Sequence, residues 1–287
     1  MTEPETTGPQ VVRIPFPLKL GQAGLDVLDG RAAPVAARDA ATVMLLRTGP
    51  AGLEVYMLRR QASMAFAAGM SVFPGGSVDA RDADEDVAWA GPDAHEWGRV
   101  LDAPPDLARA LVCAAVRETF EESGVLLAGE TPDTVVADTT SDDWERDRNA
   151  LLDRSLSLAE LLAQRHLMLR SDLLRSWSRW ITPVFEPRRY DTRFFAAALP
   201  GGQRTRDVGG EAAAVYWTGP QEALETGRRG EIALLPPTAV TLAELAACGD
   251  LDGALARVPD SGARRPEVLR RDGAAWLTVP GASEYPL

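Results

Sequence analysis

The chain has little cysteine, almost no lysine and no long apolar run. Only Cys113 and Cys248 occur among its 287 residues, too few for a disulfide framework, and we expect Cys113 to be a buried thiol in a helix. No apolar run approaches the ~20 residues that a membrane-spanning helix needs. Residues 1–10 also lack the basic, apolar and cleavage-site order of a signal peptide. These absences predict a cytoplasmic protein without a membrane partner.

Acidic residues outnumber basic ones, 42 to 30, and give a formal net charge of −12. Such a chain is not attracted to nucleic acid, so we expect no nucleic-acid partner. A phosphate-rich substrate would depend on metal ions and arginine for positive charge, since Lys19 is the only lysine. The two histidines are far apart in the sequence and indicate no zinc site. The sequence leaves open whether two copies form a homodimer.

A helix that ends before Gly124 carries a cluster of carboxylates. Side chains three and four positions apart lie on one helix face, so Glu118, Glu121 and Glu122 would project together. Arg117 precedes Glu121 by four positions and can pair with it. Oxygen ligands that leave room for water and phosphate favour Mg²⁺ or Mn²⁺ over Zn²⁺. Gly124 would end the helix in the left-handed conformation. The alternative is an ordinary solvated acidic helix face.

This helix and an upstream turn together resemble a known motif. The order Arg-Glu-x-x-Glu-Glu-x-Gly-aliphatic at 117–125 resembles the second half of the Nudix box, and Phe73-Pro74-Gly75-Gly76 resembles its opening. In the family the two halves adjoin, whereas about thirty extra residues separate them here. Counting forward from Gly76 to the acidic position of the box finds Asp82, while counting back from Arg117 finds Arg109.

A box split in this way resembles the peroxisomal coenzyme A diphosphatases of the Nudix family. The resemblance extends to 180–183 and 187–195, and it spans roughly residues 39–240. It implies an α/β fold, a Nudix-type α/β/α sandwich with a mixed β-sheet, to which a helical insertion is added. It also implies a metal-dependent enzyme that hydrolyses a diphosphate linkage in a small nucleotide-containing substrate.

The resemblance assigns roles to residues of the two half-motifs. The implied metal ligands are Gly76, Glu118, Glu121 and Glu122. Glu121, Glu122 or Glu211 would take the proton of the attacking water, and the sequence leaves the choice among them open. Glu211 is expected because the family brings a further acidic residue from this region, and its alternative is an ordinary loop residue before a strand. Arg117 completes the expected catalytic group.

A coenzyme A signature places two arginines and a glycine before Phe-Pro-Gly-Gly. Arg60 and Gly69 match this signature, but Ala65 stands where the second arginine belongs. The residues expected to bind substrate are Arg60, Gly75, Arg188 and Arg189. A guanidinium forks onto phosphate oxygens, although an arginine at a strand end is also an ordinary surface charge. The alternative for Gly75 is a simple tight turn.

Coenzyme A or an acyl-coenzyme A is the first substrate expectation. ADP-ribose, NADH or a dinucleoside polyphosphate would require a different pocket around the same diphosphate chemistry. A catalytically silent Nudix-fold binding module is the alternative from another class of protein. A metal-dependent turnover assay separates the enzyme from the silent module.

The chain reads as one domain with additions. The expected segments are an irregular lead-in at 1–38 that could hold a strand at 11–14, a Nudix hydrolase domain at 39–249, and an extension at 250–287 packed on that domain. Within the insertion at 77–105, eight acidic residues against two arginines favour a solvated flap, which Trp89 and Trp97 would anchor. Local patterns predict a hairpin at 41–58, helices from near Pro105, at 142–152 and at 157–166, a Ser157 cap, and a hairpin around Asp272-Gly273.

Overall fold

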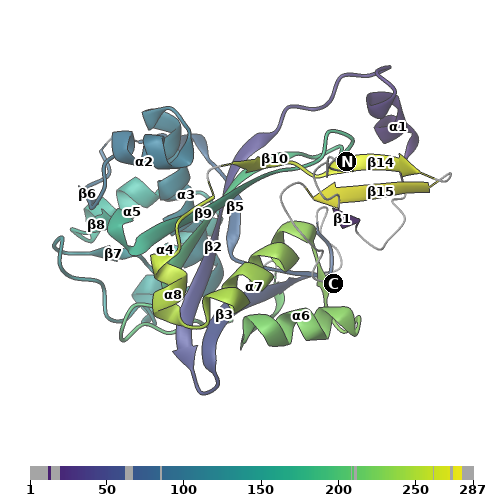
Figure 1. The fold of residues 1–287 in the computed structure, drawn as a ribbon. Coiled ribbons are helices and arrows are strands. Elements are labelled where there is room, and N and C mark those ends of the chain that lie inside the picture. The colour runs from purple at the N-terminus through teal and green to yellow at the C-terminus, as the bar shows by residue number, and fades with distance from the viewer. Residues whose placement is uncertain are drawn as a thin grey trace, which may run out of the picture.

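A nine-stranded mixed sheet with helices on both faces forms the body of the protein (Figure 1). The computed structural model describes residues 12–13, 20–61, 67–84, 86–207, 209, 212–260, 262–271 and 274–279. The main strand order is β12 (Ala233–Leu234), β4 (Met70–Val72), β3 (Gly52–Arg60), β2 (Arg38–Gly49), β10 (Tyr190–Ala198), β9 (Leu174–Ile181) and β13 (Ala263–Arg264). In addition, β11 (Ala212–Thr218) pairs with β3 and β5 (Gly75–Ser77) pairs with β2. The expected α/β/α sandwich with a mixed sheet is confirmed.

The central strands β2 and β3 form the hairpin that the sequence predicted, and β10 pairs with β2 in parallel. Successive side chains of a strand point to opposite faces of a sheet. Accordingly, Val43 and Leu45 enter one hydrophobic core, whereas Met44 and Leu46 enter the other. The apolar runs in these strands are therefore buried on both sides of the sheet.

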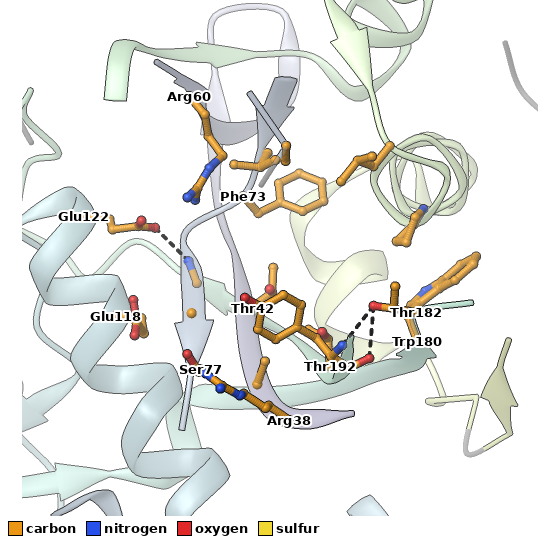
Figure 2. A pocket seen from close by; sticks show the side chains of 18 of the residues that line it. Arg38, Thr42, Arg60, Phe73, Ser77, Glu118, Glu122, Trp180, Thr182 and Thr192 are labelled. Carbon is orange, nitrogen blue, oxygen red and sulfur yellow. Dashed lines mark hydrogen bonds between the residues drawn. The ribbon is translucent and has the colours of Figure 1, made fainter. Parts of the chain in front are cut away.

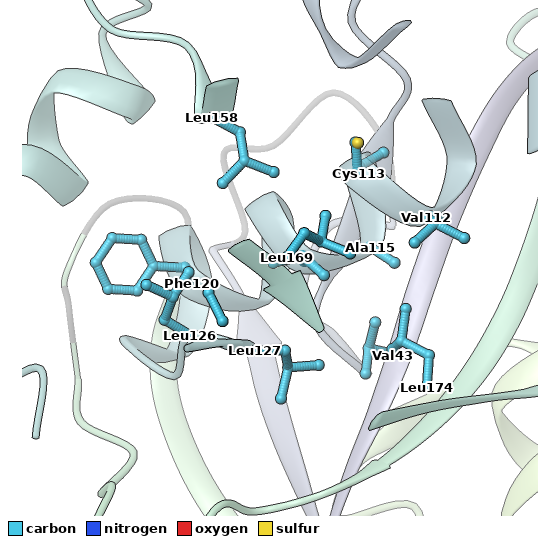
Figure 3. Packing of buried hydrophobic residues seen from close by; sticks show 14 of the residues in the cluster. Val43, Val112, Cys113, Ala115, Phe120, Leu126, Leu127, Leu158, Leu169 and Leu174 are labelled. Atoms are coloured by element: carbon cyan, nitrogen blue, oxygen red, sulfur yellow. The ribbon is translucent and has the colours of Figure 1, made fainter. Parts of the chain in front are cut away.

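Helices from two parts of the chain cover the two faces. The first core lies under α2 (Ala94–Leu101), α3 (Pro105–Ser123), α4 (Asp142–Leu152) and α5 (Leu158–Gln164). Figure 3 shows part of this core, in which Val112 and Ala115 of α3 lie near Val43 and Leu174 of the sheet. The second core lies under α6 (Pro220–Arg228), α7 (Pro236–Cys248) and α8 (Leu251–Ala256).

Helix ends follow the predicted signals. Pro105 opens α3, and Gly124 ends it with a left-handed φ of 74°. The Ser157 hydroxyl accepts a hydrogen bond from the backbone N–H of Glu160 and caps α5. Cys113 is fully buried in α3, as expected, and burial raises the pKa of its thiol to about 12. This thiol is therefore not poised for nucleophilic chemistry.

Trp89 and Trp97 anchor the insertion as expected, but the expectation that residues 77–105 form a solvated flap is wrong. Val87, Trp97 and Leu101 are buried in the first core, and the Trp97 ring lies 5.8 Å from that of Phe195. Trp97 and Leu101 are four residues apart and share the inward face of α2. Another part of the insertion, β6 (Trp89–Ala90), joins a small sheet with β8 (Met168–Arg170) and β7 (Ala128–Gly129). Five acidic residues of the insertion are nevertheless exposed, which is why composition alone suggested a flap: Asp84, Asp86, Asp93, Glu96 and Asp102.

The two ends of the chain also contribute regular structure. The strand expected at 11–14 is present as β1 (Val12–Arg13), whereas α1 (Gln22–Leu28) makes the lead-in at 1–38 less irregular than expected. A three-stranded sheet has the order β1, β15 (Ala274–Val279), β14 (Glu267–Arg271). The strands β14 and β15 are the late hairpin that the sequence predicted, although its turn at 272–273 lies outside the described residues. Among the helices that the structure describes, none is long and apolar enough to cross a membrane.

Replacing Trp97 with Ala should lower the free energy of unfolding by about 3–5 kcal/mol, because it empties a large site in the core. Urea denaturation followed by circular dichroism measures this change. Trp97→Phe should cost less, since it keeps an aromatic ring and removes a buried indole N–H without a hydrogen-bond partner among the described residues. The exposed Val100 of the same helix is the control, and Val100→Ala should change stability little. A loss below about 1 kcal/mol for Trp97→Ala would restore the flap interpretation.

Candidate active site

The strand β5 lies between α3 and β2 and brings two glycines close to both. β5 runs antiparallel to β2, with Gly75 opposite Thr42. A Cβ atom on Gly75 would overlap the carbonyl oxygen of Ala41, and one on Gly76 would overlap the carboxylate of Glu118. Only glycine at position 75 therefore lets the backbone approach the sheet so closely, and glycine at position 76 leaves room for the Glu118 carboxylate.

The carboxylates at the end of α3 face β5 (Figure 2). The backbone N–H of Gly75 donates a hydrogen bond of 2.7 Å to Oε2 of Glu122. Glu118 lies one turn earlier on the helix, beside Gly76. The two halves of the split sequence motif are thus in direct contact, despite the insertion between them.

Arg117 is buried and connects three parts of the chain. Its Nε and Nη2 donate to the two carboxylate oxygens of Asp82 at 2.8 and 2.9 Å. Its Nη1 donates to Glu118 at 2.7 Å and to Glu121 at 3.1 Å, and its Nη2 also donates to the carbonyl oxygen of Ser77 at 3.1 Å. The expected pairing of Arg117 with Glu121 is present. Asp82 is the acidic residue found by counting forward from Gly76, so its place in the motif agrees with this contact.

Burial raises the pKa values of Glu118 and Glu121, while the neighbouring Arg117 guanidinium opposes that shift. Water is largely excluded from these carboxylates, and Glu118 also has the charge of Glu121 nearby. One guanidinium does not fully compensate for this negative charge, so a further cation would stabilise the ionised carboxylates.

The donor set fits a hard divalent cation. Across the described residues, no three His, Cys, Asp or Glu side chains already surround one metal position. However, Nη1 of Arg117 lies between the carboxylates of Glu118 and Glu121, so these two side chains already gather around a positive charge. Carboxylate oxygens beside the open backbone of Gly76 are the kind of ligand that such cations prefer.

A cavity of about 1200 Å³ extends from these carboxylates across the sheet. This volume exceeds the roughly 300–1000 Å³ of a typical small-molecule pocket, which favours an extended ligand. In Figure 2, Glu118 and Glu122 lie on one side of the cavity, whereas Trp180 and Thr182 lie on the opposite side.

The two ends of the cavity differ in charge. A cationic end is formed by Arg38, Arg81 and Arg154. Arg81 and Arg154 both pair with Asp79, two residues beyond Ser77, and Figure 2 places Arg38 beside Ser77. An apolar end is formed by four lining residues that belong to the second core, Phe73, Trp180, Phe185 and Leu277, and Pro236 also lines the cavity. One ligand that spans the cavity would thus meet cations, carboxylates and an apolar wall.

Most of the expected site residues lie around this one cavity. They are Arg60, Gly75, Gly76, Arg117, Glu118, Glu121 and Glu122. Figure 2 shows the Arg60 side chain extending toward the Gly75 and Glu122 region. Glu211 lies outside the described residues, so its expected role stays a prediction. The same holds for the signature position Ala65.

Arg188 and Arg189 are not brought to the cavity, contrary to the expectation that they bind substrate. Arg189 is buried, and its guanidinium donates to the carbonyl oxygens of Thr182, Pro183 and Val35 at 2.6–3.1 Å. It therefore holds the connection between β9 and β10 against the lead-in. Arg188 is exposed and does not line the cavity. Sequence spacing could not distinguish these roles, because both arginines stand at the same strand entry.

Sequence reasoning missed the cationic end. Arg154 follows α4 with a left-handed φ of 62°, and its carbonyl oxygen accepts a 3.0 Å hydrogen bond from Arg81. These residues are far apart in the sequence and carry no motif, so only the fold brings them together. Trp180 belongs to a segment that supported the family resemblance, and it also lines the cavity.

Two further arginines donate hydrogen bonds to backbone carbonyl oxygens at the end of α3. Arg148 of α4 is 1% exposed, and its Nη1 donates to the carbonyl oxygen of Glu121 at 2.9 Å. Arg206 donates to the carbonyl oxygen of Gly124 at 3.3 Å, and both arginines pair with Glu145. Carboxylates are unfavourable at the negative end of a helix dipole, and cations at that end offset the effect. The pair therefore positions the turn that carries the acidic residues.

A protein-family model for the NUDT19 Nudix domain matches residues 92–245. The acyl-coenzyme A diphosphatase NUDT19 of Xenopus laevis is 25% identical over 277 residues, which cover 81% of this chain and 71% of the relative. The Gallus gallus protein of the same name is 30% identical over 239 residues, which cover 69% of this chain and 62% of the relative. The crystal structure of a Nudix hydrolase from Alicyclobacillus acidocaldarius matches with a TM-score of 0.65 at 28% identity, over 78% of this chain and 98% of that one. The chain thus spans less than two thirds of the chicken relative.

Glu121→Gln and Glu122→Gln should each lower metal-dependent hydrolysis by more than about 100-fold, since even the residues that support metal ligands typically contribute 10–100-fold. The fold should remain, because the substitutions keep size and relieve repulsion. Turnover measured against Mg²⁺ concentration, with circular dichroism as a check of folding, gives the comparison. The exposed Glu130 is the control, and Glu130→Gln should behave as wild type. Near-normal turnover in both site variants would reject the metal assignment.

Arg148→Met should weaken Mn²⁺ binding about 10–100-fold, because it frees the turn that carries Glu121 and Glu122. Electron paramagnetic resonance measures free Mn²⁺ directly, without substrate. Arg146 stands on the same helix but is exposed, and Arg146→Met should leave the affinity unchanged. Arg148→Lys keeps one charged donor and should recover part of the affinity. If folded Arg148→Met binds Mn²⁺ as wild type does, Arg148 does not position the acidic turn.

Proposed function

The chain belongs to the NUDT19 Nudix domain family of Nudix hydrolases, and on this premise we propose that it cleaves the diphosphate linkage of coenzyme A or an acyl-coenzyme A. One observation carries this choice of substrate. A single cavity joins the carboxylates of α3 to a cationic end and to an apolar end. Coenzyme A has the matching sequence of parts, a phosphorylated nucleoside, a diphosphate and a long uncharged arm.

The chemistry follows from the residues around β5. Glu118, Glu121, Glu122 and the backbone of Gly76 would hold Mg²⁺ or Mn²⁺. When bound, the metal supplies positive charge to the diphosphate and lowers the pKa of an attacking water. The Gly75 N–H holds Glu122 in place, and Arg117 holds Glu118 and Glu121. Glu121, Glu122 or Glu211 would accept the proton of the water.

The ends of the cavity would orient the substrate. The cationic end suits the nucleoside with its 3′-phosphate, since guanidinium groups bind phosphate oxygens through paired hydrogen bonds. Arg60 lines the cavity near the carboxylates and would contact the diphosphate. The apolar end suits the pantetheine arm and an attached acyl group. The names of the frog and chicken relatives support the same substrate class. A cytoplasmic location and a homodimer stay predictions.

Incubation of the protein with coenzyme A and Mg²⁺ or Mn²⁺ should yield 3′,5′-adenosine diphosphate and 4′-phosphopantetheine. Water cleaves the diphosphate linkage in this reaction, so each product keeps one of the two phosphates of that linkage. Chromatography resolves both products from the substrate, and the relative kcat/KM on ADP-ribose, NADH and a dinucleoside polyphosphate measures specificity. A clearly higher kcat/KM on one of these would overturn the coenzyme A proposal but keep a Nudix diphosphatase. No turnover of any substrate with either metal would favour a silent binding module.

A further inference from the structure

The loop between β9 and β10 places a carboxylate, Glu186, in the wall of the cavity. Its side chain is half-buried, and it follows Phe185 of the apolar end. The backbone N–H of Glu186 donates to the carbonyl oxygen of Pro183 at 3.2 Å, which closes a tight turn. Glu186 is thus fixed by its backbone, while its carboxylate is left to the cavity.

No cation among the described residues pairs with this carboxylate. The nearby Arg189 directs its guanidinium to three backbone carbonyls, and Arg188 is exposed outside the cavity. Burial alone raises the pKa of the Glu186 carboxyl, with no offsetting positive charge. A partly buried carboxylate without a compensating charge is unfavourable. A carboxylate with a purely structural role would therefore be expected to pair with a cation.

The charge pattern of the cavity indicates which part of a ligand Glu186 would meet. The three arginines of the cationic end lie near Ser77 and Asp79. Glu186 instead lies in the loop after Thr182, which Figure 2 shows across the cavity from Glu118. A diphosphate bound through metal ions on the α3 carboxylates would direct its phosphorylated nucleoside to the cations. The uncharged arm would then extend toward Glu186.

We propose that Glu186 selects acyl groups by charge. This inference rests on the proposed function and adds a selectivity to it. A neutral arm, with its amide N–H donors, is compatible with a carboxylate in the wall, whereas an acyl group that ends in a carboxylate is repelled. The protein therefore acts on coenzyme A esters of neutral acids in preference to those of dicarboxylic acids.

Butanoyl-coenzyme A and succinyl-coenzyme A test the proposal, since both carry four acyl carbons and differ in the terminal charge. At pH 8, where a carboxylate is ionised, wild-type kcat/KM should favour the butanoyl ester at least about tenfold. Repulsion between like charges a few ångströms apart near a protein surface exceeds the roughly 1.4 kcal/mol that a tenfold ratio represents. Glu186→Gln should bring the two substrates to within about threefold of each other, because the repelling charge is gone. The ratio of two substrates does not depend on how much of a variant is folded.

Two further variants control the result. Glu186→Asp keeps the charge and should keep the preference, and Glu225→Gln changes an exposed acid on α6 and should leave it as in wild type. An equal kcat/KM on both esters in wild type, or an undiminished preference in Glu186→Gln, would overturn the role of Glu186 alone. If coenzyme A and both esters remain intact with either metal, the proposed function fails and the selectivity fails with it.

Discussion

The buried guanidinium of Arg117 is the interaction on which the candidate site depends. It donates hydrogen bonds to the helix carboxylates Glu118 and Glu121. It also donates to the carbonyl oxygen of Ser77 at the end of β5 and to Asp82 at the start of the insertion. A buried charge is stable only when most of its hydrogen bonds are made. The hydrogen bonds of Arg117 can all be made only if α3, β5 and the start of the insertion pack together. The geometry of the acidic cluster is therefore a consequence of tertiary packing.

The same contact explains how a motif can be split by a long insertion. Asp82 lies in the short helix η1 (Ala80–Ala83), directly after β5. Asp82 thus precedes α2 in the chain. The later residues of the insertion therefore do not separate Asp82 from Arg117. Trp97 and Leu101 then bury the inserted helix in the core. The insertion supports α3 from the side and leaves β5 in contact with the acidic turn.

Features set by local chemistry could be predicted, and those set by distant contacts could not. The β2–β3 hairpin, the left-handed Gly124 and the Ser157 cap depend on neighbouring residues, and the structure has all three. The burial of the insertion depends on how α2 packs against the core, and composition does not show this packing. Similarly, Arg189 looks like a phosphate-binding residue until the fold brings three carbonyl oxygens to it. The cationic end joins arginines from three separate segments, and no spacing pattern could show it.

A double-mutant cycle between Asp82 and Arg117 tests the central claim most directly. Asp82→Asn, Arg117→Met and the double variant would be compared by urea unfolding. Arg117→Met leaves buried carboxylates without their cation and should cost about 3–5 kcal/mol. Asp82→Asn should cost less, because Glu118 and Glu121 still pair with Arg117. The double variant removes both charges and should cost less than the sum by about 2 kcal/mol or more. Additive losses would show that the two residues act independently, and they would contradict the view that this contact joins the two halves of the site.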